Sequence, residues 1–210
     1  HLTLTTIMTT KSTTKKTTNK PKTQVVKGPQ QGIPSLPKNP FVFEVLDVVS
    51  KQRTKAKKVQ ALKKYEENHL KMILIWNFDE SVVSLLPPGE VPYSGFEDQA
   101  TSSGTLSTKI DENVRRMHET GSFSLGSSDK EGHTTIRREA KNFYYFVKGG
   151  SDGMSTVRRE TMFINILEGL HPLEAEILCL IKDKKLSDKY NITQEVVAEA
   201  YPDINWGNRS

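Results

Sequence analysis

Apolar residues are concentrated in two blocks, 39–93 and 136–205, separated by a stretch rich in Gly, Ser and Thr. Residues 1–38 are dominated by Thr and Lys, and no Asp or Glu precedes Glu44. Such segments bury too little apolar surface to offset the conformational entropy lost on ordering. We therefore predict a disordered tail and linker at 1–38, one domain over 39–205 with a flexible insertion at 94–135, and a C-terminal tail at 206–210.

Within both blocks, apolar residues recur three or four positions apart, as on the buried face of a helix. No run alternates apolar and polar residues as a half-buried strand would. The predicted fold class is all-α: a compact domain of about six helices, with a disordered basic N-terminal tail and a flexible central insertion. The first expected helix starts at Asn39-Pro40 and the second runs from a Thr54 cap to about residue 66. Three more span 68–78, 136–147 and 155–169. The last two run from His171-Pro172 to about residue 185 and from Thr193 to just before Pro202. The helix over 68–78 is apolar almost all round and should be central.

Several classes of protein are excluded or disfavoured by composition. No apolar run approaches the roughly 18–20 residues that a bilayer-spanning helix needs, so we expect no membrane association. A single cysteine, Cys179, excludes an internal disulfide framework and a zinc cluster of thiolates. The histidines are scattered without ligand spacing, so no metal site is expected.

The motifs of common catalytic sites are also missing. The sequence contains no phosphate-binding G-x-x-x-x-G-K-[ST], no G-x-S-x-G and no H-E-x-x-H. The glycine-rich run 148–153 follows a predicted helix rather than a strand, so a helix-ending turn is the better interpretation. We therefore expect no catalytic residues, no cofactor and no small-molecule substrate, and hence a protein that is not an enzyme.

Positive charge is unevenly placed. Lys and Arg number 30 against 25 Asp and Glu, a net charge of +5, yet residues 51–64 hold seven basic residues and no acid. Lys57 and Lys64, seven positions apart, would share a helix face and could contact phosphates. A solvated helix face is an equally good interpretation of this run. Lysines near a helix end also complement the helix dipole without any ligand.

The leading hypothesis is that helix packing brings distant cations together as a track for a polyanion. Such a track would bind nucleic acid, most simply the backbone of duplex DNA, with little sequence specificity. The predicted contact residues are Lys55, Lys57, Lys64, Arg158, Arg159, Lys182, Lys184, Lys185 and Lys189.

The two blocks together resemble an uncharacterised protein family of T-even-type tailed phages, notably those of cyanobacteria and other marine bacteria. The resemblance covers most of 33–205 apart from the insertion and supplies no activity. The segments that carry it are Asn77-Phe78-Asp79, Leu85-Leu86-Pro87-Pro88-Gly89-Glu90-Val91-Pro92-Tyr93, Arg158-Arg159-Glu160-Thr161-Met162-Phe163-Ile164, Leu167-Glu168-Gly169-Leu170-His171-Pro172 and Lys182-Asp183-Lys184-Lys185-Leu186. It implies a phage accessory protein that acts in the host cell cytoplasm.

A looser resemblance links 43–86 to the N-terminal helical DNA-binding domain of phage-type ATP-dependent DNA ligases. Its elements are a Thr/Lys-rich helix start at 50–55, a helix ending in Trp76-Asn77-Phe78-Asp79, the pair Arg158-Arg159, and a short helix before Tyr201-Pro202-Asp203-Ile204. The resemblance implies a grip on the phosphates of duplex DNA. Ligase activity is not implied, since the nearest string to the adenylated K-x-D-G motif, Lys109-Ile110-Asp111-Glu112, lacks the glycine.

A protein-interaction module without nucleic-acid binding, acting in host takeover or in assembly, is the alternative function. The segments 87–93 and 201–206 carry aromatic residues that could anchor a partner, such as a phage or host replication or transcription protein. The same aromatic residues could instead pack back on their own helices. Met8 is a plausible translation start, which would place residues 1–7 upstream of the protein.

Overall fold

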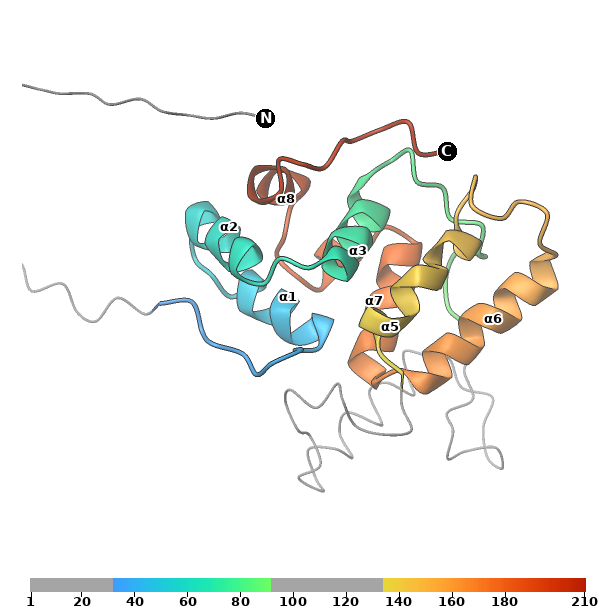
Figure 1. Ribbon diagram of the computed structural model, residues 1–210, viewed down its shortest axis with the longest axis horizontal. Coiled ribbons are helices and arrows are strands. Elements are labelled where there is room, and N and C mark those ends of the chain that lie inside the picture. The colour runs from blue at the N-terminus through green and yellow to red at the C-terminus, as the bar shows by residue number, and fades with distance from the viewer. Residues whose placement is uncertain (1–31, 92–133) are drawn as a thin grey trace, which may run out of the picture. The chain divides into compact units, whose positions relative to one another are not determined.

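The computed structural model describes residues 32–91 and 134–210 (Figure 1). The predictions of a disordered tail before residue 32 and of a flexible insertion over most of 94–135 fall on residues outside these ranges. Within them the predicted all-α class is confirmed, and the only β-pairing there is an isolated bridge between Ser84 and Val147. The helices are α1 (Val42–Ser50), α2 (Lys55–Lys64), α3 (Asn68–Phe78), α5 (Ile136–Glu139), α6 (Thr156–Gly169), α7 (Pro172–Lys182) and α8 (Gln194–Ala200), with the 3-10 helices η1 (Ala140–Phe146) and η2 (Leu186–Asp188).

Local capping signals start most of these helices where the sequence predicts. The side chains of Thr54, Ser155 and Thr193 each accept a hydrogen bond from a backbone N–H in the first turn of α2, α6 and α8. His171 does the same for α7, whose first residue is Pro172. These interactions lie within three residues in the chain, which is why sequence alone could predict them.

The start of α1 differs from the prediction. Asn39 has a left-handed backbone with φ of 52°, and the helix begins two residues after Pro40, at Val42. A distant carboxylate replaces the expected cap, because Glu174 Oε2 of α7 accepts from the backbone N–H of Val42 at 3.0 Å. The cap is therefore a tertiary contact.

The core is built around α3, as its apolar circumference predicts. Leu70, Ile73 and Leu74 are at most 1 % exposed, and α3 packs on α7. Trp76 lies edge-on to Phe143 of η1 and donates from Nε1 to Ser84 Oγ at 2.9 Å. The two apolar blocks thus form one core, in which α5 contacts α3 and Phe143 of η1 contacts Trp76 near the C-terminal end of α3.

The predicted helix over 136–147 is instead a short α-helix continued as a 3-10 helix. Its end is held by backbone pairing with the extended segment after α3, since Leu85 N–H donates to Phe146 O and Lys148 N–H to Val83 O, both at 2.8 Å. A tight turn follows, in which a Cβ on Gly150 would lie 1.9 Å from the carbonyl oxygen of Tyr144. Only glycine fits there.

The compact unit spans 33–210 and is wider than the predicted domain of 39–205. Ile33 and Leu36 pack on the core, and the backbone N–H of Leu36 donates to the Tyr65 hydroxyl at 3.0 Å. The residues after 205, predicted as a tail, are also held: Gly207 N–H donates to Asp79 Oδ2 at 3.0 Å and Arg209 Nε to the same oxygen at 2.9 Å. Segments on both sides of 39–205 therefore contact the domain, through backbone groups and through side chains such as Leu36 and Arg209.

Candidate nucleic-acid interface

Helix α2 carries a group of exposed lysines that have no carboxylate partner in the part of the chain that the structure describes. The helix packs on α1 and α8 and buries Val59, Ala61 and Leu62. Lys57, Lys63 and Lys64 remain exposed, within an arc of about 120° at 100° per residue. We call these three lysines the α2 basic face.

Lys58 of α2 is buried and so does not belong to the α2 basic face. The amino group of Lys58 donates to the carbonyl oxygens of Ser50 at 3.2 Å and Asn191 at 2.5 Å, so it closes the end of α1. Burial lowers the pKa of Lys58. Lys64, although exposed, lies near the carbonyl of Ile33 at 3.2 Å and the hydroxyl of Ser35 at 3.4 Å. Neither contact neutralises its charge.

Lys55, a predicted contact residue on the same helix, is neutralised. Its amino group lies 2.5 Å from a carboxylate oxygen of Glu195 and 3.2 Å from one of Glu199, both on α8. The hydrogen bond to Glu195, then that to Glu199, raises the pKa of Lys55. Sequence reasoning did not anticipate these ion pairs because the acids lie near the other end of the chain, Glu195 being 140 residues away.

The arginine pair is divided between two roles. Arg159, only 5 % exposed, donates to the carbonyl oxygens of Tyr145 at 2.8 Å, Ser151 at 3.0 Å and Met154 at 3.2 Å. It joins the first turn of α6 to the turn after η1, and its burial leaves almost none of the guanidinium open to a phosphate. Arg158 is exposed and lines a groove beside η1.

The predicted cluster after residue 182 is mostly structural as well. Lys182 is 3 % exposed and donates to the carbonyl oxygens of Pro87 at 2.7 Å and Gly89 at 3.1 Å. Lys184 donates to the carbonyl oxygens of Trp76 at 2.7 Å and Asp79 at 2.9 Å, closing the end of α3, and burial lowers its pKa. Two of the four lysines are therefore unavailable to a ligand.

The remaining two lysines of that cluster are exposed but differ from each other. Lys189 forms an ion pair with Glu176. Lys185 has no carboxylate partner within the described ranges and lines a pocket with Glu176 and Asp188. An acidic setting of this kind disfavours a phosphate.

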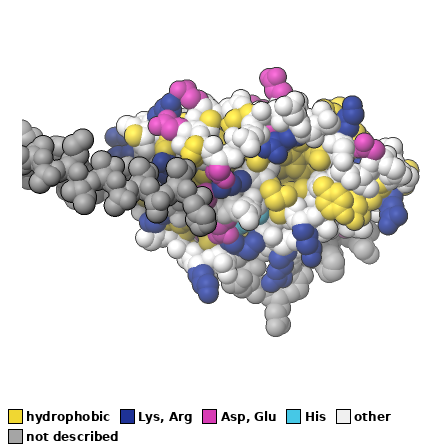
Figure 2. Space-filling view, turned by 45° about the horizontal axis from the view of Figure 1, so that its top comes forward, with side chains coloured by type: hydrophobic (Ala, Val, Ile, Leu, Met, Phe, Trp, Pro, Cys, Tyr) yellow, Lys and Arg dark blue, Asp and Glu magenta, His cyan; other side chains and the backbone are white. Residues whose placement is uncertain are grey.

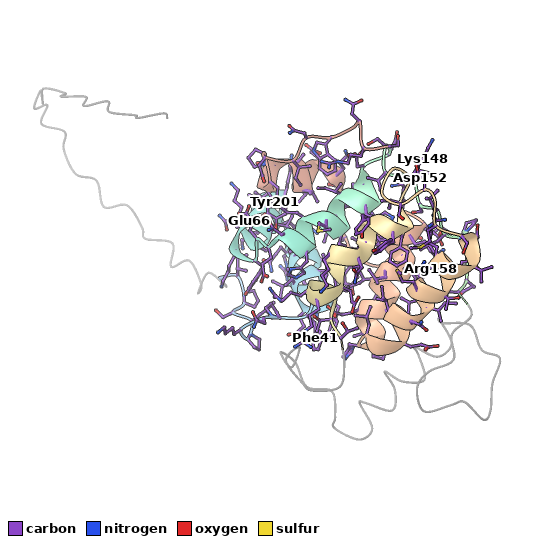
Figure 3. All side chains as sticks on the ribbon, turned by 45° about the vertical axis from the view of Figure 1, so that its right-hand side comes forward. Phe41, Glu66, Lys148, Asp152, Arg158 and Tyr201 are labelled. Atoms are coloured by element: carbon purple, nitrogen blue, oxygen red, sulfur yellow. The ribbon has the colours of Figure 1, made fainter. Side chains whose placement is uncertain are left out.

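The single track of nine cations is therefore not formed. α2 and α6 lie on opposite sides of the folded unit in Figure 1, and Glu66, just beyond α2, lies far across the molecule from Arg158 in Figure 3. On the face in Figure 2, Lys and Arg side chains are spread out, with Asp and Glu among them. Sequence reasoning also missed Lys63, although the acid-free run 51–64 contains it and helix spacing would have found it.

The segments 87–93 and 201–206, which the alternative function uses to anchor a protein partner, bury apolar side chains in the domain where the structure describes them. Tyr201 is fully buried and donates from its hydroxyl to the carbonyl oxygen of Leu62 at 2.5 Å. Leu86 and Val91 are buried, and Trp206 packs against the core. Tyr93 lies outside the described residues. Tyr201 and Trp206 therefore pack on their own domain, as the second interpretation of these segments expects.

Comparison with known proteins places the chain in a family. The model of a family of unknown function, DUF6433, matches residues 45–131 and 106–188, together more than half of the chain. The chain belongs to this family. Its membership in an uncharacterised family is thereby confirmed.

The DUF6433 match spans all of α2 and α5 to α7, so the α2 basic face and Arg158 lie inside it. No curated protein and no solved structure matches the chain.

Three further findings concern this DUF6433 protein. In the ranges that the structure covers, no helix has the length and apolar character needed to cross a bilayer. The same residues contain no group of three or more His, Cys, Asp or Glu side chains arranged to hold a metal ion. Cys179 is partly buried, and burial raises the pKa of its thiol.

Proposed function

We propose that this protein is a non-catalytic phage accessory protein that binds nucleic acid, with the α2 basic face resting on the phosphates of duplex DNA. The observation that carries the proposal is the acid-free exposed side of α2, since Lys57, Lys63 and Lys64 have no carboxylate partner among the described residues. The acidic residues near α2 are directed to other lysines: Glu195 and Glu199 to Lys55, for example.

Unneutralised lysines on a rigid helix suit a polyanion for a physical reason. Each phosphate that a lysine neutralises releases condensed counterions, which favours binding at low salt and carries no sequence information. The Thr/Lys-rich sequence before residue 32 adds cations without any acid. The looser resemblance to the helical domain of phage DNA ligases agrees with backbone contacts, and the phage resemblance implies action in the host cell cytoplasm.

The proposal predicts a measurable fall in salt sensitivity. In a fluorescence anisotropy titration with a duplex of about 20 base pairs, the triple variant Lys57→Gln/Lys63→Gln/Lys64→Gln should bind more weakly. The slope of log Kobs against log salt should fall in magnitude by about 0.9 for each phosphate that is no longer neutralised, hence by about 2 to 3. Circular dichroism should show the helix content of the parent, because all three side chains are exposed.

The matched control is Lys185→Gln, which also removes an exposed lysine but in the acidic setting near Glu176. It should bind the duplex as the parent does. The same affinity and the same salt slope in parent and triple variant would contradict the proposal, as would a parent protein that does not bind duplex at about 50 mM salt.

A further inference from the structure

A long groove separates α6 from the α5–η1 segment. Its volume is about 830 Å³, in the range of ligand-binding clefts. One wall is a single face of α6, with Arg158, Thr161, Met162 and Asn165 at spacings of three and four residues. From Arg158 to Gly169 this wall extends about 16 Å at 1.5 Å per residue.

The opposite wall depends on the 3-10 conformation of η1. With three residues per turn, side chains three apart stand above one another. Glu139, Asn142 and Tyr145 therefore line the groove together. The adjoining exposed row consists of Arg138, Lys141 and Tyr144. An ordinary α-helix over the same residues would spread each row around the helix.

An aromatic pair lies at the edge of this wall: Tyr145 lines the groove, and Tyr144 belongs to the adjoining exposed row. The rings of Tyr144 and Tyr145 have centroids 4.1 Å apart at an interplanar angle of 32°, and Tyr144 is 45 % exposed. Val157, at the same end of α6 as Arg158, is 75 % exposed. In Figure 2 hydrophobic side chains gather in the half of the view where Figure 1 places α5 and α6. Exposed aromatic rings are stacking surfaces for nucleic-acid bases.

The charge around the groove is positive. Arg138, Lys141 and Arg158 are exposed and have no carboxylate partner in the two described ranges. The one acid among the described residues that line the groove, Glu139, accepts from Thr134 Oγ1 at 2.6 Å and from Asn142 Nδ2 at 3.2 Å and keeps its negative charge, which the three cations outnumber. The Asn165 amide makes no hydrogen bond with the described residues and faces the groove.

We propose that this η1–α6 groove binds unpaired nucleotides of a single-stranded nucleic acid. One base stacks on Tyr144 beside the groove, and the amide of Asn165 inside it meets a base edge. Arg158 in the groove and Arg138 and Lys141 next to it lie along the phosphates. Cations beside aromatic rings and free amides favour this ligand over a peptide, whose backbone carries no charge. The inference does not depend on the α2 basic face, which lies on the other side of the folded unit (Figure 1).

The test uses the full chain and a single strand of about 12 nucleotides that contains 2-aminopurine, whose fluorescence is quenched when it stacks. The parent should bind and quench the probe. Tyr144→Ala should weaken binding about tenfold and abolish most of the quenching, because one base no longer stacks. Arg158→Gln should lower the magnitude of the salt slope by about 0.7, the value for one phosphate contact on a single strand.

Two controls share the chemistry but lie elsewhere: Met72→Ala removes an exposed apolar side chain from α3, and Lys185→Gln removes an exposed cation. Both should bind and quench like the parent. The triple α2 variant should also retain quenching, so failure of one site is distinguishable from failure of the other. Unchanged affinity and quenching in Tyr144→Ala would overturn the inference. A parent protein that binds no single strand at about 50 mM salt would also overturn it, and a peptide would then be the better candidate ligand for the groove.

Discussion

Glu174 joins three helices through one carboxylate. It is 1 % exposed, and its two oxygens accept from the first backbone N–H groups of α1 (Val42) and α5 (Ile136), both at 3.0 Å. Burial raises its pKa to about 7, although both hydrogen bonds and the charge of Arg137 act in the opposite direction. His69, buried on α3, shifts the other way: burial lowers its pKa to about 4.

These two groups predict opposing pH dependences of stability. Between about 4.5 and 7 the folded state holds the Glu174 proton more tightly than the unfolded chain, so this group makes the free energy of unfolding fall as pH rises. Between about 4 and 6.5 the unfolded chain holds the His69 proton more tightly, so that group makes the free energy of unfolding rise with pH. Their effects should largely cancel between about pH 4.5 and 6.5.

In Glu174→Gln, the pH dependence of stability that comes from His69 should no longer be cancelled. Because a glutamine has one acceptor oxygen, one helix loses its cap, at a cost of about 1–3 kcal/mol. The free energy of unfolding of this variant should rise clearly with pH from about 4.5 to 6.5, whereas that of the parent stays nearly level. Urea denaturation across this pH range measures both, with exposed Glu80→Gln as the control. Parallel profiles for Glu174→Gln and the parent would contradict this assignment.

At the scale of elements, the turn after η1 decides how η1 meets α6. Arg159 of α6 donates to carbonyl oxygens on both sides of this turn, and Gly150 inside it lies against the Tyr144 backbone. Gly149 just before it has φ of 91°, a conformation that favours glycine. The glycine-rich run that the sequence suggests as a helix stop is thus a close contact between backbones.

Gly150→Ala should therefore be costly and Gly153→Ala should not. A Cβ at 150 meets the carbonyl oxygen of Tyr144 at 1.9 Å, so backbone must move, at a cost of about 1–3 kcal/mol. At Gly153 nothing lies within 4 Å of a built Cβ, and an effect within about 1 kcal/mol is expected. Thermal denaturation of both variants checks the pair. Equal stability of the two would contradict the close contact.

At the scale of the whole molecule, Asp79 ties the end of the chain to the end of α3. Its carboxylate accepts from the backbone N–H and hydroxyl of Ser81, from Gly207 N–H and from Arg209 Nε. Burial alone would raise its pKa, but the hydrogen bonds from Ser81, Gly207 and Arg209 outweigh burial and lower the pKa to about 2. The stability that Asp79 contributes is present above pH 3.8 and is lost as pH falls toward 2.

Asp79→Asn should destabilise the fold by about 2–4 kcal/mol at pH 7, because its amide would face N–H donors where the carboxylate accepted them. Hydrogen exchange at residues 205–209 should speed up in this variant. Asp203→Asn, which breaks an exposed ion pair with Lys71, should cost less than about 1 kcal/mol. Unaltered exchange at the chain end in Asp79→Asn would show that the C-terminal segment is held by other contacts.

The helical class, the central position of α3 and most helix starts could be predicted from local patterns, since caps such as Thr54 and Ser155 act within one turn and apolar spacing follows from helix geometry. Whether each lysine or arginine is exposed, paired or buried depends on tertiary packing. Arg159 and Lys182 became buried donors to backbone carbonyls, and Lys55 met Glu195. A lysine has the same local pattern whether it faces solvent, a carbonyl or a carboxylate, so its partner is known only when segments far apart in the chain have packed together.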